Sequence, residues 1–297
     1  MKKSLTILGV VIGAGLIALF TLNRASAATI AIIDTSVNSS QVKNIVHEVC
    51  FTTNASCAGN TLTAEGTGAA NILPGAWSIL GINHGTEVAE TALQANPNVK
   101  IVFIRITDTL GSNGYNGTLF MHTSQSSLDQ GLAWVAKNYK QYGIQDVTIS
   151  QELKFSSGSC PTDTSFTSFV ESLKNNNVPV FAGAGNDGLQ NNIAWPACSN
   201  DVISVGAASD QGSPLYFSNL GPSVKLMSLG SLTVPLPTNA TGTAITPTRV
   251  AGTSMASPWA ATLWATNYTG TWQQQVNNLQ KLPIVIDKYG NKYPFLM

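Results

Sequence analysis

Short apolar runs alternate along most of the chain with stretches in which apolar residues recur at helical spacing. The runs have the length and composition of buried strands, and they are Thr29–Ile33, Val99–Ile104, Asp146–Ile149, Val178–Phe181 and Val202–Val205. The segments with helical spacing are Glu87–Ala95, Ser127–Lys140, Ser165–Asn175 and Ser254–Asn267. This alternation predicts an α/β fold in three layers, with a mostly parallel central sheet and helices on both of its faces.

Two features of the pattern concern the organisation of the chain. No linker or compositional break divides it, so we expect one domain. The stretch 228–247 is rich in Thr, Pro and Gly and is the one long segment without a periodic pattern. We predict that it is an irregular surface loop.

The first residues differ in character from the rest. Met1–Lys3 is positively charged, Leu5–Leu22 is uncharged and strongly apolar, and Ala25–Ala27 has the A-x-A form of a cleavage site. We therefore predict a secretory signal peptide over residues 1–27, a mature domain over 28–297 and an extracellular location. The alternative is an uncleaved membrane anchor that faces outward, because the apolar run just reaches the spanning minimum of about 17 residues.

Charge is scarce and balanced. Charged residues make up 10% of the chain, and 15 Lys+Arg face 15 Asp+Glu, whereas a typical share is about 25%. The composition excludes a disordered protein, which needs high charge and little to bury. It also excludes an electrostatic nucleic-acid binder, because there is no basic excess to neutralise phosphates.

The chain has four cysteines, and an exported protein can keep them as disulfides. Of three possible pairings, Cys50 with Cys57 closes a small polar loop and leaves Cys160 with Cys198. Metal binding is the competing interpretation, but neither spacing is C-x₂-C and no histidine lies nearby in a ligand pattern. We favour two structural disulfides and predict no metal site.

Three residues far apart along the chain share one chemical requirement. Asp34 ends the first strand, His84 opens a helix, and Ser254 lies in a small turn that starts another. Singly, the acid could be a helix cap and the histidine a satisfied polar residue. Together they suit nucleophilic catalysis, because a serine needs a base to attack a carbonyl and the base needs a carboxylate to hold its tautomer.

The segment Gly252–Pro258, with the order Asp, His, Ser along the chain, resembles the subtilisin-like serine proteases (subtilases, peptidase family S8). The esterase-type hydrolases instead run Ser, acid, His and carry G-x-S-x-G, which is absent here. The resemblance implies a subtilisin-like fold and serine endopeptidase activity on polypeptide substrates. It also implies that Asp34, His84 and Ser254 form the catalytic triad.

A glycine-rich segment after the fourth predicted strand has two interpretations. Gly183–Gly188 reads G-x-G-x-x-G, as in a dinucleotide-binding turn, but loop sequence follows it rather than a helix. The resemblance implies instead that it is the oxyanion segment, in which the Asn186 amide and the Ser254 N–H stabilise the developing charge. We therefore expect no nucleotide and no required cofactor. Structural calcium is allowed but not predicted, because the usual calcium loop after the histidine helix looks deleted.

The resemblance also implies a cleft in which an extended peptide lies as a strand between two edge segments. The candidate substrate-binding residues are Gly114, Tyr115, Ser150, Gln151, Gly183 and Gly185. The family usually has Ser-Leu-Gly-Gly where this chain has Ser150–Lys154. Glu152 and Lys154 could read charge on a substrate or be solvated, and we favour the solvated interpretation.

A second class of function competes with the enzyme. A catalytically weak, subtilase-like peptide-binding protein (a pseudoenzyme) would explain three departures. Ser36 stands where glycine is usual, the edge at Ser150–Lys154 is altered, and no long pro-segment separates the predicted cleavage site from Asp34. The enzyme is favoured because all four polar catalytic groups are present. We expect a monomer that contacts a membrane only if the first segment stays uncleaved.

Overall fold

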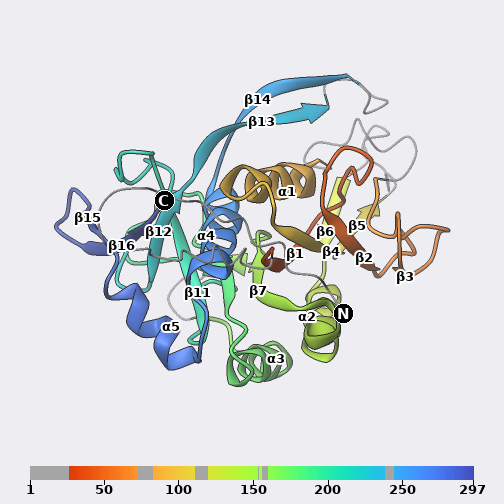
Figure 1. Cartoon of the computed structure of the whole chain (residues 1–297), viewed down its shortest axis with the longest axis horizontal. Helices are drawn as coiled ribbons and strands as arrows, with labels where there is room; N and C mark the ends of the chain where they lie inside the picture. The colour runs from red at the N-terminus through yellow and green to blue at the C-terminus, as the bar shows by residue number, and fades with distance from the viewer. Residues whose placement is uncertain (1–26, 73–82, 111–119, 153, 156–159, 238–243) are drawn as a thin grey trace, which may run out of the picture.

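The computed structural model describes residues 27–72, 83–110, 120–152, 154–155, 160–237 and 244–297. Its centre is a ten-stranded sheet with the strand order β15-β16-β12-β11-β9-β7-β1-β4-β2-β3 (Figure 1). These strands are β1 Thr29–Asp34, β2 Ile45–Phe51, β3 Thr63–Glu65, β4 Lys100–Arg105, β7 Ile144–Ile149, β9 Val180–Gly183, β11 Val202–Ala208, β12 Leu226–Leu229, β15 Ile284–Ile286 and β16 Lys292–Leu296.

The other elements are five helices and three two-stranded pairs among the described residues. The helices are α1 His84–Ala95, α2 Gln125–Tyr142, α3 Thr164–Asn175, α4 Thr253–Asn267 and α5 Trp272–Leu279. The pairs are β5 Thr107–Leu110 with β6 Phe120–Thr123, β8 Lys154–Phe155 with β10 Ala194–Trp195, and β13 Ser231–Pro237 with β14 Ile245–Ala251.

The sheet is parallel from β2 to β16, and only β3 and β15 pair antiparallel to their neighbours. The side chains of successive residues in β1 point to opposite faces of the sheet, as in any strand. Ile30 and Ile32 pack with residues of α1 and α4, whereas Ala31 and Ile33 pack with residues of α2 and α3. The result is two helical layers around one sheet, which confirms the predicted three-layer α/β fold (Figure 1).

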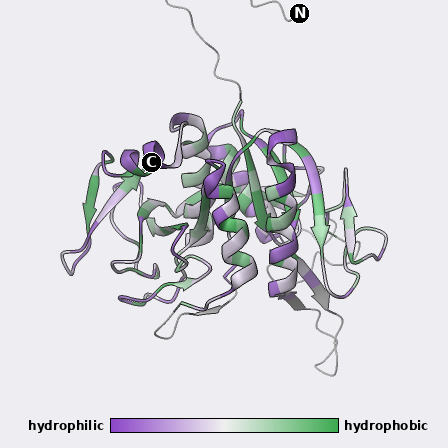
Figure 2. Ribbon diagram, turned by 90° about the horizontal axis from the view of Figure 1, so that it is seen from below, coloured by the Kyte–Doolittle hydropathy of each residue, from purple (hydrophilic) through white to green (hydrophobic). Residues whose placement is uncertain are grey.

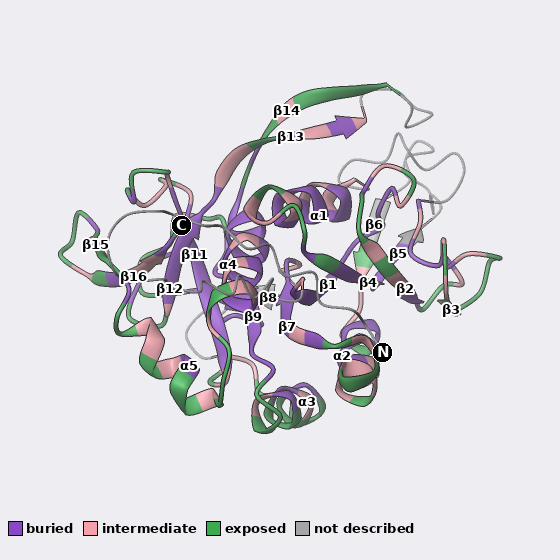
Figure 3. Cartoon of the chain, viewed as in Figure 1, coloured by how far each residue is buried: buried purple, intermediate pink, exposed green. Residues whose placement is uncertain are grey.

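The central strands are buried (Figure 3) and carry mainly apolar residues (Figure 2), although β7 includes Gln145, Asp146 and Thr148. Every residue of β1 and of β11 is buried. A parallel strand covered on both sides reads as a continuous apolar run, which is why these strands were recognisable in the sequence. All five predicted strands and all four predicted helices are present, with ends that differ by a few residues.

The prediction of an irregular loop over 228–247 was wrong. Ser228 belongs to β12, and most of the rest forms the antiparallel ribbon β13–β14, in which Pro235 lies opposite Pro247. Proline fits here because a two-stranded ribbon has free edges, so alternate N–H groups point away from the partner strand. Exposed Thr and Pro residues hide the strand pattern, since the outer part of β14 buries little.

Both expected disulfides occur in the structure. Cys50 on β2 is bonded to Cys57 in the following loop, and Cys160 before α3 is bonded to Cys198 after β10. The bonds close loops with sequence separations of 7 and 38 residues. Loop-closure entropy gives them about 2 and about 4 kcal/mol of stabilisation respectively.

The described residues contain neither a membrane-spanning helix nor a cluster of metal ligands. No helix in those ranges combines the length and the apolarity needed to cross a membrane. No group of three or more His, Cys, Asp or Glu side chains in the same ranges could hold a metal ion. The predicted signal peptide lies almost entirely outside the described residues.

Candidate active site

Three neighbouring parallel strands end at one edge of the sheet, and two helices begin there. β1 ends in Asp34, β7 runs into Ser150, and β9 ends in Gly183. The first turns of α1 and α4 carry His84 and Ser254. The carboxyl ends of parallel strands are where α/β proteins place their chemistry.

The acid and the imidazole are joined directly. Asp34 is completely buried, and its Oδ1 lies 2.8 Å from His84 Nδ1. The Thr35 N–H donates to the same oxygen at 2.6 Å, and Gln151 Nε2 lies 3.4 Å from it. Because a carboxylate can only accept, it fixes a proton on Nδ1, so that Nε2 is the acceptor whenever the ring is neutral.

The close approach of α1 to β1 depends on Gly85. A Cβ atom at this position would lie 2.5 Å from Ser36 O and 2.6 Å from Phe103 Cζ. The Gly85 N–H donates to Thr35 Oγ1 at 2.8 Å, which ties the first turn of the helix to the end of the strand. Glycine therefore sets the position of the preceding histidine.

Carboxylates dominate the electrostatics around the ring. Burial lowers the pKa of His84, but Asp34, followed by Glu87 and Glu152, outweighs it and raises the pKa to about 9. Glu87 itself, in the first turn of α1, has a raised pKa because of burial and the Asp34 charge, although His84 lowers it. The imidazolium form is therefore favoured in the free protein.

Ser254 lies in the first turn of α4, where backbone N–H groups have no partner within the helix. The residue keeps 7% of its surface exposed. Among the described residues its hydroxyl forms no hydrogen bond, so the structure does not join it to His84. Catalytic hydrogen bonds are often long without a substrate and tighten when one binds.

Asn186 is held against the same turn. Its Oδ1 accepts from the Thr253 N–H at 2.8 Å, and this backbone donor orients the amide so that Nδ2 faces away. A Cβ atom on Gly252 would lie 3.6 Å from Asn186 Oδ1 and 3.7 Å from Ser254 Oγ, so amide and hydroxyl lie on the same side of the turn. The structure therefore brings a carboxamide and an alcohol together.

The prediction that Glu152 is solvated was wrong. Its Oε1 accepts from Asn186 Nδ2 at 2.9 Å and from Thr253 Oγ1 at 3.2 Å. Burial, with a further contribution from the Asp187 charge, raises the pKa of Glu152 to about 7, although Thr253 and His84 act in the opposite direction. The carboxyl is thus part of the site, and the sequence signal for it was the charge in place of the usual glycine.

The predicted substrate-binding residues fall into two groups. Gly183 and Gly185 are buried, and added Cβ atoms would come within 2.9 Å of Thr253 Oγ1 and 2.2 Å of Asn219 Nδ2. These two glycines let the segment of Asn186 pack against its neighbours.

Ser150 is buried beside the end of β1, and its N–H donates to Ile33 O at 3.3 Å. Gln151 is half-buried and lies on the Asp34–His84 pair, a role that the sequence did not suggest. Gly114, Tyr115 and the side chain of Lys154 lie outside the described residues.

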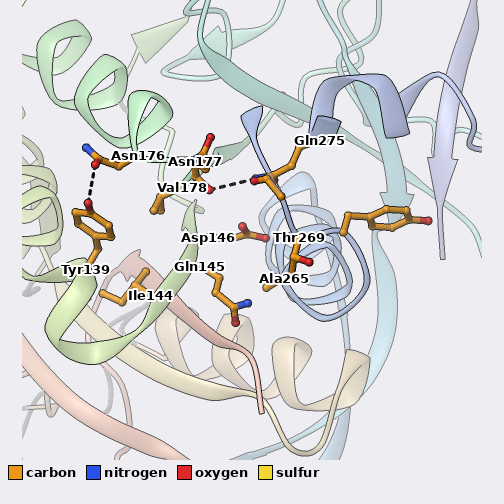
Figure 4. Close-up of a pocket in the computed structure, with 12 residues that line it drawn as sticks. Tyr139, Ile144, Gln145, Asp146, Asn176, Asn177, Val178, Ala265, Thr269 and Gln275 are labelled. Atoms are coloured by element: carbon orange, nitrogen blue, oxygen red, sulfur yellow. Dashed lines mark hydrogen bonds between the residues drawn. The ribbon is translucent and has the colours of Figure 1, made fainter. Parts of the chain in front are cut away.

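A separate hollow of about 230 Å³ lies at the other end of the sheet, where β7 begins (Figure 4). Its lining includes Asp146, whose burial raises its pKa well above the ordinary value, and Gln275, which donates to Asn177 O at 3.1 Å. Its lining residues include no histidine, cysteine or lysine. We place no chemistry there.

Known proteins of one family resemble this chain. The subtilase family matches residues 25–282. Subtilisin DY of Bacillus licheniformis is 31% identical over 67% of this chain and 69% of its own length. Subtilisin-like protease 3 of Pseudogymnoascus destructans is 28% identical over 66% of this chain, but the match spans only 45% of that longer protein.

Solved structures show the same fold. A cold-adapted subtilisin-like serine proteinase superposes with a TM-score of 0.61 at 21% identity, covering 92% of this chain and 90% of its own. The prenylagaramide maturation protease PagA gives a TM-score of 0.60 at 19% identity over 88% and 85% of the two chains. With the family match over most of its length, this chain belongs to the subtilase family of subtilisin-like serine proteases.

Proposed function

We propose that this chain is a serine endopeptidase that cleaves polypeptides through Asp34, His84 and Ser254. The Ser254 hydroxyl attacks the scissile carbonyl carbon while His84 Nε2 takes its proton. The imidazolium then returns that proton to the leaving amine, and Asp34 holds the ring and stabilises its charge. Water enters next, is deprotonated by the same ring, and releases the acyl group from Ser254.

The developing oxyanion needs donors that are already in place. The Ser254 N–H and Asn186 Nδ2 are the two candidates, one from a helix N-terminus and one from a side chain fixed by the Thr253 N–H. Fixed donors of this kind contribute because they do not have to reorganise as charge develops.

One observation carries the proposal. The 2.8 Å contact between Asp34 Oδ1 and His84 Nδ1 is made by a fully buried carboxylate whose position two further donors support. A buried carboxylate that fixes the tautomer of a half-buried histidine supports a base, since packing alone would not need this arrangement.

A small, uncharged fluorophosphonate tests the proposal. We expect it to label the full-length protein covalently and to fail with Ser254→Ala. Ser257→Ala is the matched control, because Ser257 lies in the same helix but is buried and bonded to Thr148 at 2.8 Å. Equal labelling of wild type and Ser254→Ala, or none in the folded wild type, would contradict the proposal.

The peptide-binding protein without useful turnover is a second candidate. It is favoured by the carboxyl of Glu152 on Asn186 and by the missing bond between Ser254 and His84 in the described structure. The same experiment separates the two, because a pseudoenzyme would bind peptides but would not be labelled.

The proposal also includes how the chain is exported and in what form it acts. Residues 1–27 act as a signal peptide, the mature chain is a secreted monomer of one domain, and its activity requires no metal. N-terminal sequencing of the exported protein checks the first point: a start at Ala28 supports it, and a start at Met1 supports the anchor.

A further inference from the structure

The strongest unexplained feature of the site is the carboxyl of Glu152, which lies on the group proposed to bind the oxyanion. Glu152 Oε1 is 2.9 Å from Asn186 Nδ2 and 3.2 Å from Thr253 Oγ1. Three elements meet there: the segment after β7, the segment after β9 and the first turn of α4.

This contact conflicts with the proposed chemistry. An oxyanion bonded to Asn186 Nδ2 would lie about 3 Å from that atom, so two negatively charged oxygens would lie within about 6 Å of each other. The second N–H of the amide could still donate, but the charge on Glu152 would oppose the charge that develops in the transition state.

Among the described residues, His84 is the one cation that acts on this carboxylate. The titratable groups around Glu152 are His84 from α1 and Asp187 from the segment after β9, and a second acid, Glu87, also acts on His84. His84 helps only while protonated, and in that form it cannot act as the base. While Glu152 is ionised and His84 is neutral, the charge that offsets the carboxylate has to come from outside the described residues, and the substrate can supply it.

Geometry indicates which part of the substrate would do so. The carbonyl oxygen that becomes the oxyanion is two bonds from the α-carbon of the residue on the acyl side of the scissile bond. A lysine or arginine side chain on that carbon is long enough to reach a carboxylate that shares Asn186 with the oxygen, and arginine can bind it with two hydrogen bonds.

Resting on the proposed endopeptidase function, we propose that Glu152 is a specificity-determining residue. It occupies the Asn186 amide in the free protein and yields it to substrates that carry a lysine or arginine on the acyl side of the scissile bond. An uncharged residue at that position leaves the carboxylate on Asn186 and is cleaved more slowly.

Two peptides that differ at one side chain test this inference. One carries arginine at that position, and the other carries citrulline, which has nearly the same shape but no charge. We expect kcat/KM of the wild type to favour arginine by about 10-fold or more. In Glu152→Gln the preference should fall to near unity, mainly because the citrulline peptide is cleaved faster.

Asp187→Asn is the matched control. It removes an acid near Glu152 that has no hydrogen bond to Asn186, so most of the preference should remain. A wild type that does not distinguish the peptides, or a Glu152→Gln variant that keeps the preference, overturns the inference.

The wild type alone provides a second measurement if the variant does not fold. Both peptides use the same base, so titration of His84 cancels in the ratio of the two rates. Protonation of Glu152, whose pKa burial raises to about 7, does not cancel. The preference for arginine should therefore fall as the pH drops below 7, and a ratio independent of pH overturns the inference.

The phosphonate separates failure of this inference from failure of the proposed function. Labelling of Ser254 together with equal cleavage of the two peptides overturns only the role of Glu152. No labelling in either the folded wild type or folded Glu152→Gln overturns the endopeptidase, and the inference with it.

Discussion

The two halves of the proposed active site, the acid–base half and the oxyanion half, differ in the partners that their side chains have. In the acid–base half, Asp34 and His84 are bonded to each other, and the backbone of Thr35 and Gly85 holds the ends of β1 and α1 together. In the oxyanion half, the Thr253 N–H orients Asn186 through the Oδ1 atom of its amide. The Nδ2 atom of the same amide donates to Glu152.

The difference shows that a side chain can be well oriented and still lie in an electrostatic environment that does not suit catalysis. A backbone donor orients each half: the Thr35 N–H donates to Asp34, and the Thr253 N–H donates to Asn186. In the first half the proposed base, His84 Nε2, forms no hydrogen bond among the described residues. The second presents a carboxylate, so its electrostatics have to change before it can stabilise an anion.

Removal of the Asn186 amide in two backgrounds would sharpen this comparison most. In Glu152→Gln, where the amide is free of negative charge, Asn186→Ala should lower kcat by about 10²–10³-fold, a magnitude that was measured in subtilisin, a relative. In the wild type, with an uncharged substrate, the loss should be smaller because the donor is already engaged. Equal losses in the two backgrounds would break the comparison.

A substitution in the acid–base half should act through packing. Gly85→Ala places a methyl group against Ser36 O and Phe103. We expect it to lower the free energy of unfolding by about 1–3 kcal/mol and to lower kcat as His84 shifts. Thermal denaturation and turnover measure the two effects.

Gly131→Ala is the control for that experiment, because its added Cβ would meet side-chain methyl groups at 3.2 and 3.3 Å rather than backbone. We expect a much smaller loss of stability there. A Gly85→Ala protein as stable and active as the wild type would show that the close approach of α1 is not needed.

The smallest expected effect is on the pH profile. His84 must be neutral to accept a proton, so kcat/KM should rise with pH through the region of its pKa, about 9. The charge of Glu87 favours the imidazolium, so Glu87→Gln should move this rise to lower pH. A rise that stays in place, or moves to higher pH, would contradict the assignment.

The contact between Asp34 and His84 agrees with the order of elements that the sequence predicted. Asp34 follows a continuous apolar strand and His84 opens a segment with helical spacing, so local patterns placed both residues at the ends of elements. The serine turn was equally clear, because the segment Gly252–Pro258 matches the subtilase motif without a change.

The oxyanion half was less predictable because its decisive contacts join distant segments. Glu152 reaches Asn186 and Thr253 across 34 and 101 positions of the chain. A charged residue near a strand end is more often solvated, so composition favoured the wrong interpretation. Only the adjacency of β7 and β9 in the sheet brings these side chains together.

Strands with polar positions were also missed. β2 includes the buried Glu48, whose carboxylate accepts from the N–H groups of Gly68 at 2.8 Å and Ala70 at 3.1 Å. Such a strand is not recognisable from a continuous run of apolar residues, because polar residues interrupt it. The ribbon β13–β14 escaped for the related reason that it buries few side chains.

The carboxyl of Glu152 also bears on how far copies of such a protein would cleave one another. A protease at high concentration is surrounded by copies of itself, and every bond it accepts is a site of self-destruction. Selection for lysine and arginine would leave few such bonds here, since the whole chain has 15 basic residues among 297. Arg105 is buried in β4, so the bond that follows it is not accessible in the folded protein. If Glu152 has the role proposed above, the same carboxylate would also limit cleavage of one copy of the chain by another.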